Sequence, residues 1–168
     1  MRLNGRVFEA VMAAKERRQA ADLYHSALEV RVPEGRFVIE MTPASTAEHG
    51  AVANGSVGAR WAGRFRIFRY EVRCWRDGTI PDVAEAVESP RRVSNDLDCA
   101  RRLLNLAPQV PTAVWGRDEL HTGEMWNSNS LTSWLLAGSG LDVDAIRPPV
   151  NGRAPGWAAG LVVARRLP

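Results

Sequence analysis

Three side chains of this sequence could together carry out acyl transfer: His25, Glu40 and Ser128. An imidazole can take the proton of a hydroxyl nucleophile, and a carboxylate can hold that imidazole in one tautomer and stabilise its protonated form. The three residues are far apart in the sequence, so the elements that carry them have to bring them together.

The segments that hold His25 and Glu40 are predicted to form a β-hairpin. Residues 24–31 and 36–42 flank residues 32–35 (VPEG), whose Pro-x-Gly pattern favours a tight reversal between two strands. Antiparallel pairing would bring His25 and Glu40 near each other at the open end of the hairpin. The alternative is a structural pair of polar residues on a solvated face.

Ser128 directly precedes a predicted helix over residues 129–137, which Gly138 and Gly140 would end. Its hydroxyl would lie where unpaired backbone N–H groups and the positive end of the helix dipole converge. That position suits a nucleophile whose reaction generates an oxyanion, because the N–H groups can receive the negative charge. Ser and Asn are also the usual capping residues at a helix start, so capping is the alternative role.

Five further residues could contact a substrate. Asn127 and Asn129 could present an amide to the oxyanion, although capping is at least as frequent a role. Trp126 and Trp157 could form aromatic walls for an acyl chain or a peptide side chain, unless they belong to the core. Arg153, in a loop bounded by Pro and Gly, could bind a carboxylate or phosphate through two N–H bonds, or simply be solvated.

The ordered set of segments resembles the circularly permuted papain-like hydrolases, the permuted branch of the NlpC/P60 superfamily. That branch includes the YiiX-like proteins, the lecithin retinol acyltransferase group and the PPPDE peptidases. The resemblance lies in residues 24–30 (YHSALEV), 37–41 (FVIEM) and 126–136 (WNSNSLTSWLL), while residues 44–115 match only in general character. It implies an α+β fold with an antiparallel sheet and packed helices, and a hydrolase or acyltransferase that acts on an amide or ester bond without a metal or cofactor.

One departure from the family pattern concerns the nucleophile, which is Cys in the family and Ser128 here. A helix N-terminus and a nearby His can stabilise a thiolate, whereas a hydroxyl has to lose its proton during attack. Three interpretations stay open: a natural serine enzyme with His25 as general base and Glu40 orienting it, an engineered Cys-to-Ser form, or a natural pseudoenzyme that only binds. Cys74 and Cys99 are predicted to be ordinary core residues, on a strand and in mid-helix.

Further elements are predicted with less direct bearing on the site. A helix should begin with Ser94 or Asn95 as N-cap, because acidic residues suit its first turn and apolar residues follow at helical spacing. Residues 44–60 should form a surface loop, and residues 158–164 could add a last strand. Residues 7–20 fit a helix or a buried strand equally well.

Residues 64–75 alternate as a strand does, with a phase slip near Phe68 that indicates a bulge or a bend. After the slip, Tyr70, Val72 and Cys74 share one side.

Composition limits the remaining possibilities. The chain has 168 residues, 45% apolar and 24% charged, which is typical of one globular domain spanning residues 1–168. The net charge is +3 and Lys15 is the only lysine among the 22 basic residues, but the acidic residues almost balance them, so we expect no nucleic-acid partner. No apolar run is long enough to span a membrane and no secretory signal is recognisable, so we expect a cytoplasmic protein. The acyl-transfer chemistry considered above leads us to expect a small-molecule, peptide or lipid substrate.

Overall fold

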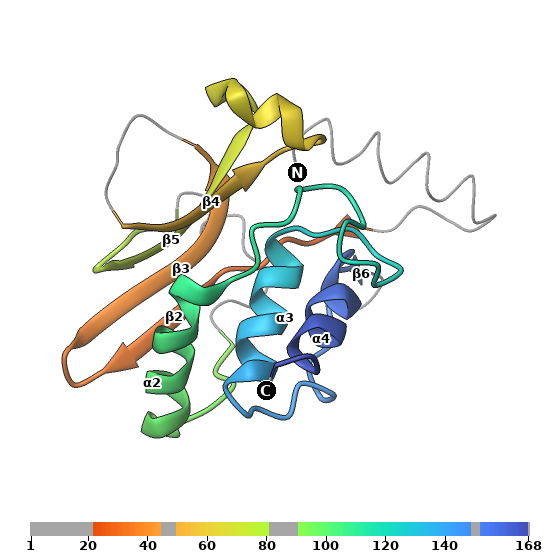
Figure 1. The fold of residues 1–168 in the computed structure, drawn as a ribbon. Helices are drawn as coiled ribbons and strands as arrows, with labels where there is room; N and C mark the ends of the chain where they lie inside the picture. Colours follow the sequence, from red (N-terminus) through yellow and green to blue (C-terminus); the bar gives the residue numbers. More distant parts are fainter. Residues whose placement is uncertain (1–21, 45–49, 81–90, 149–151, 168) are drawn as a thin grey trace.

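The computed structural model describes residues 22–44, 50–80, 91–148 and 152–167 (Figure 1). This part of the chain is α+β, as the sequence predicts: a four-stranded antiparallel sheet in the order β2-β3-β5-β4 lies beside three α-helices. A separate two-stranded piece joins β1 and β6 in parallel. The segment 7–20, left open between helix and strand, lies outside the described residues.

The predicted hairpin is present as β2 (Leu28–Val32) and β3 (Gly35–Pro43), with Leu28 opposite Ile39 and Val32 opposite Gly35. Its first strand begins four residues later than predicted, so His25 lies before the strand and not at its start. The reason is a competing set of backbone bonds. β1 (Asp22–Leu23) pairs with β6 (Gly152–Arg153), and the Tyr24 N–H continues this pairing by donating to the Arg153 carbonyl at 2.9 Å.

The predicted loop over residues 44–60 is wrong at residues 51–56, because Ala51–Ser56 forms the edge strand β4 against β5 (Arg69–Arg76). Small residues hide this strand in the sequence, since they provide no apolar alternation. Gly55 shows why they are needed: a Cβ at this position would lie 2.5 Å from the ring of the buried Tyr70. Residues 45–49 of the same prediction lie outside the described residues.

The predicted strand over residues 64–75 is also too long. Arg64 ends the 3-10 turn η1 (Arg60–Arg64), and after the extended Phe65 a second 3-10 turn follows, η2 (Arg66–Phe68). The phase slip near Phe68 marks the point where β5 begins. Beyond that point the prediction is confirmed: Tyr70, Val72 and Cys74 all face the core.

The helix α2 (Leu97–Leu106) begins slightly later than predicted, because Asp96 is the N-cap in place of Ser94 or Asn95. The Asp96 carboxylate accepts hydrogen bonds from the N–H groups of Asp98 and Cys99 at 2.8 and 3.3 Å, and Ser94 Oγ accepts from the Asp96 N–H at 3.0 Å. Carboxylates are among the preferred N-cap groups. Cys99 therefore lies in the first turn of α2 and not in mid-helix.

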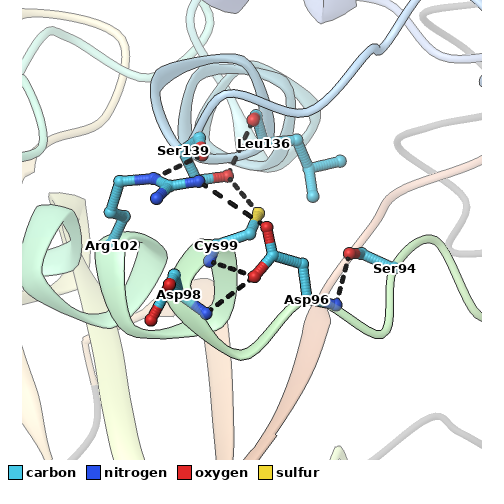
Figure 2. Close-up of polar contacts among 7 residues, drawn as sticks. All are labelled: Ser94, Asp96, Asp98, Cys99, Arg102, Leu136 and Ser139. Atoms are coloured by element: carbon cyan, nitrogen blue, oxygen red, sulfur yellow. Dashed lines mark hydrogen bonds and ion pairs between the residues drawn. The ribbon is translucent and has the colours of Figure 1, made fainter.

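A buried polar contact joins the start of α2 to the end of α3 (Ser128–Gly138), as Figure 2 shows. Cys99 Sγ donates to Ser139 Oγ at 3.4 Å, Ser139 Oγ donates to the Leu136 carbonyl at 2.8 Å, and Arg102 Nε donates to the Ser139 carbonyl at 2.9 Å. Carbonyl groups at a helix C-terminus lack intrahelical partners. This contact supplies donors to the carbonyl groups of Leu136 and Ser139 and holds α2 and α3 together at that end.

The strand predicted over residues 158–164 is wrong, because Trp157–Ala164 forms the helix α4. A short apolar run fits either structure by periodicity alone. Two features outside the run decide for helix: Gly156 turns the chain with a φ of +87°, and Glu124 Oε2 accepts hydrogen bonds from the N–H groups of Gly156 and Ala158 at 2.9 and 3.2 Å. The Glu124 carboxylate thus serves the first turn of α4, where negative charge is stabilising.

The core lies between one face of the sheet and the helices. On the sheet side it contains Ile39, Met41, Tyr70 and Val72, and on the helix side it is formed by Leu103 from α2 and by three residues of α3, Leu131, Trp134 and Leu135. Among the described helices none has the length and apolar character to cross a membrane.

Candidate functional site at the start of α3

Three segments that are distant in the sequence meet at the N-terminus of α3: residues 24–26, 126–130 and 153–157 (Figure 1). Asn129 is the common partner. Its Nδ2 donates to the carbonyl groups of Tyr24 and Pro155 at 2.9 and 3.0 Å, and its Oδ1 accepts from Ser26 Oγ at 3.0 Å. Since His25 lies between Tyr24 and Ser26, the fold holds the backbone of His25 beside the residue that follows Ser128. The His25 side chain is exposed.

Asn127, and not Ser128, caps α3. Its Oδ1 accepts from the N–H groups of Asn129 and Ser130 at 2.9 and 3.2 Å, and Ser130 Oγ accepts from the Asn127 N–H at 3.1 Å, which completes a capping box. The capping alternative is therefore right for Asn127. Ser128 is the first residue of the helix, and the cap uses neither its N–H nor its hydroxyl.

Ser128 is buried, with 5% of its surface exposed, and its side chain forms no hydrogen bond to any residue that the structure describes. The neighbouring hydroxyls differ. Ser130 Oγ donates to the Gly156 carbonyl at 2.7 Å, and Ser133 Oγ donates to the Trp157 carbonyl at 2.7 Å. Both of those serines hold α4 against α3, whereas the hydroxyls of Ser128 and of the buried Thr132 form no such bond among the described residues.

The two asparagine amides are committed to the fold. Asn127 Nδ2 donates to the Pro155 carbonyl at 2.8 Å, and Asn129 uses both amide hydrogens for Tyr24 and Pro155. This placement gives no support to the hypothesis that either amide serves an oxyanion. The remaining donor at this end of the helix is the Ser128 N–H.

The two tryptophans and Arg153 surround the site in different ways. Trp126 is 1% exposed and belongs to the core, with its indole N–H unpaired among the described residues, so it is no substrate wall. Trp157 is half-buried at the first position of α4, and Arg153 is half-buried in β6 opposite Leu23. Both residues are thus on the segment that Asn127 and Asn129 bind.

Glu40 lies on the central strand β3, with 6% of its surface exposed. Because side chains alternate along a strand, it points away from the face on which Ile39 and Met41 contact α3. On that other face its register partner is Arg73. The last residue pair of the hairpin is Leu28 and Ile39, and Glu40 is the next residue along β3. The backbone of Glu40 is therefore close to residues 25–27. Its side chain, however, points to the face of the sheet that does not contact α3.

Sequence reasoning missed Glu124, the carboxylate that holds the start of α4. A single acidic residue two positions before Trp126 has no periodicity or spacing that could have indicated this role. No group of three or more His, Cys, Asp or Glu side chains within the described ranges could hold a metal ion.

Two surface hollows lie away from this site, one of about 210 Å³ beside Ala137 and Leu161 and one of about 290 Å³ beside Phe37 and Leu104. Comparison with protein-family models, with curated proteins and with solved structures found no match. The functional proposal therefore rests on the residues and contacts at the start of α3.

Proposed function

We propose that this chain is a hydrolase or acyltransferase that acts on an amide or ester bond, with a permuted papain-like fold, Ser128 as nucleophile and His25 as general base. One observation carries the proposal: the bonds from Asn129 to Tyr24 and Ser26 hold the backbone of His25 beside the residue that follows Ser128, at a helix N-terminus. From this position the His25 imidazole would have to turn towards Ser128 to activate its hydroxyl, and the proposal is that it does so.

In the proposed reaction, Ser128 Oγ attacks the carbonyl carbon of the substrate while His25 takes the hydroxyl proton. The Ser128 N–H donates to the oxyanion that forms, supported by the positive end of the α3 dipole. His25 then gives the proton to the leaving amine or alcohol, which leaves an acyl ester on Ser128. Water or another acceptor attacks this ester with His25 again as base, and the free Ser128 hydroxyl is restored.

Glu40 keeps its proposed role as the residue that orients His25. Its support is its position on β3, next to residues 25–27, together with its burial. Because its side chain leaves the sheet opposite α3, it would have to reach the imidazole from the side remote from Ser128. His25 would then stand between the carboxylate and the hydroxyl, as the order of a triad requires.

Reaction with a fluorophosphonate probe tests the proposal, because such probes label only activated serine hydroxyls. We expect one labelled peptide, containing Ser128, and a labelling rate at least about a hundredfold lower in His25→Ala, the usual scale of general-base catalysis. His121→Asn is the matched control, since His121 is exposed and has a φ of +53°, which Asn tolerates.

The competing function is a ligand-binding module of the same fold, which the small exposed fraction of Ser128 favours. Absence of labelling at Ser128 both in this chain and, with iodoacetamide, in Ser128→Cys would indicate that module and overturn the enzyme proposal. Turnover that appears only in Ser128→Cys would show that the fold is catalytic and that the hydroxyl is an inactive replacement for a thiol.

A further inference from the structure

A second candidate site lies far from α3 in the sequence. The arginine-aromatic segment, residues 60–69 (RWAGRFRIFR), forms the turns η1 and η2 and enters β5; Figure 1 shows it as the yellow coil at the top, at the other end of the sheet from α2. Of the seven large apolar side chains that are exposed in the described part of the chain, four belong to this segment: Trp61 (67%), Phe65 (47%), Ile67 (82%) and Phe68 (42%). Apolar exposure concentrated in this way marks an interaction surface.

The exposure belongs to an ordered conformation. Ala62 is buried and anchors η1, the Phe65 N–H donates to the Ala62 carbonyl at 2.9 Å, and the Val57 N–H donates to the Phe68 carbonyl at 2.8 Å. Arg69 Nε donates to the Gly63 carbonyl. These bonds use the polar backbone groups and leave the apolar side chains directed to solvent.

The same segment is positively charged: it contains four arginines and no acidic residue. Arg60 forms an ion pair with Glu119, whereas the bonds of Arg69 go to neutral carbonyl groups and leave its charge uncompensated. Arg64 lies over the rings of Trp61 and Phe65, with its guanidinium carbon 5.4 and 4.7 Å from their centroids. The surface therefore offers cations and apolar groups side by side.

Two features of the segment help to decide whether its partner is a single-stranded nucleic acid, a folded protein or another anionic surface. A single-stranded nucleic acid would stack its bases on aromatic faces, but Arg64 covers one face of both Trp61 and Phe65, and the most exposed side chain is the aliphatic Ile67. The four arginines of the segment, with no acidic residue among them, favour an extended anionic surface over the apolar pocket of a folded partner.

We propose that the arginine-aromatic segment binds the surface of an anionic lipid bilayer. The apolar side chains enter the boundary between headgroups and acyl chains, which is fluid and needs no matching shape, and the guanidinium groups contact lipid phosphates. The charge of the segment complements the charge of such a surface. The chain would thus attach through η1 and η2, and none of the described helices would need to cross the bilayer.

Co-sedimentation of the full chain with vesicles tests this proposal. We expect binding to mixed phosphatidylglycerol and phosphatidylcholine vesicles at least about tenfold tighter than to pure phosphatidylcholine. The double variant Ile67→Ser, Phe68→Ser should weaken this binding by about tenfold or more, because it removes apolar surface from the insertion. The matched control is Val93→Ser, Leu97→Ser, which changes two other exposed apolar residues outside the segment.

The depth of Trp61 gives a second, independent measurement. Vesicles with brominated acyl chains should quench part of the intrinsic fluorescence, and Trp61→Phe should remove this quenching while its vesicle binding stays within about threefold of the starting chain. Equal binding to both kinds of vesicle, or equal weakening by the control variant, would overturn the proposal. So would tighter binding of a single-stranded oligonucleotide that the Ile67→Ser, Phe68→Ser variant loses.

Discussion

The hydroxyl of Ser128 differs from those of Ser130 and Ser133 in its hydrogen bonding. Ser130 and Ser133, on the same helix, both donate to carbonyl groups of the segment leading into α4, and Asn127 caps the helix. Ser128 has no such bond among the described residues. Its oxygen is not among the fully buried polar atoms that lack a partner, which in the described part of the chain are the indole N–H groups of Trp126 and Trp134. Solvent can therefore reach the Ser128 hydroxyl, as a nucleophile requires.

For single residues, the sequence shows which residues lie at the start of α3 better than it shows what each of them does. It predicted Ser128, Asn127 and Asn129 as candidate residues at the start of a helix, but it could not tell which of them caps the helix, since Ser and Asn share that preference. The roles of Asn127 and Asn129 depend on their hydrogen bonds to the carbonyl groups of Pro155 and Tyr24, and these two residues lie far away in the sequence.

The first prediction concerns Glu40. If this carboxylate orients His25, Glu40→Gln should lower the rate of fluorophosphonate labelling at Ser128 by at least about tenfold, because the amide no longer stabilises a protonated imidazole. Glu71→Gln is the control, since Glu71 is partly buried on the neighbouring strand and pairs with Arg73. Equal rates in the two variants would remove Glu40 from the site and leave Ser128 and His25 as a pair.

Elements with local signals could be predicted, and elements defined by distant contacts could not. The hairpin has its Pro-x-Gly turn, and α3 has an apolar face and a cap, so both are confirmed within a few residues. By contrast, β4 exists because β5 offers it an edge, and α4 because Glu124 and α3 stabilise it. Their own residues carry no helical or strand periodicity that decides between the two.

The contact of α4 with α3 leads to a second prediction. A Cβ on Gly160 would lie 2.1 Å from the Ser130 carbonyl oxygen and from Ser133 Oγ. Gly160→Ala should therefore lower the free energy of unfolding by about 1–3 kcal/mol through overpacking, although the same change in an open helix would raise it by about 0.5–1 kcal/mol.

Urea unfolding measures this effect, and Gly138→Ala is its control. Gly138 ends α3, and a Cβ there would meet only the terminal methyl groups of Leu106 and Leu167, at 3.0 Å. Equal stability changes in the two variants would show that α4 does not pack on α3 as described.

For the molecule as a whole, the free energy of unfolding at high pH depends on an ionisable group in the core, the hydroxyl of Tyr70. Tyr70 is fully buried and donates to the Ala113 carbonyl at 2.7 Å. Its burial, with a further contribution from the charge of Glu119, raises the pKa of its hydroxyl far above the ordinary value. The folded chain therefore keeps this proton at a pH where the unfolded chain loses it.

The third prediction follows from the sign of that shift. The contribution of Tyr70 to stability is constant below about pH 10 and then falls by about 1.4 kcal/mol per pH unit as the unfolded chain ionises. Tyr70→Phe should remove this slope while lowering stability at neutral pH by about 1 kcal/mol through the lost hydrogen bond.

Unfolding by urea at several alkaline pH values gives both quantities. Burial also raises the pKa of the Cys74 thiol, which acts with the same sign, but this contribution is present in both proteins and cancels in the comparison. Parallel pH profiles for the two proteins would contradict the assignment of the slope to Tyr70.

The approach of His25 to position 128 can be measured directly with a thiol in place of the hydroxyl. In Ser128→Cys, the rate of alkylation by iodoacetamide is followed against pH by peptide mass spectrometry, with and without His25→Ala. We predict a thiol pKa below the usual value of about 8.5 when His25 is present, and a higher one without it, because a nearby imidazolium stabilises the thiolate. The same pKa in both proteins would show that the imidazole does not reach this position and would contradict the proposed catalytic pair.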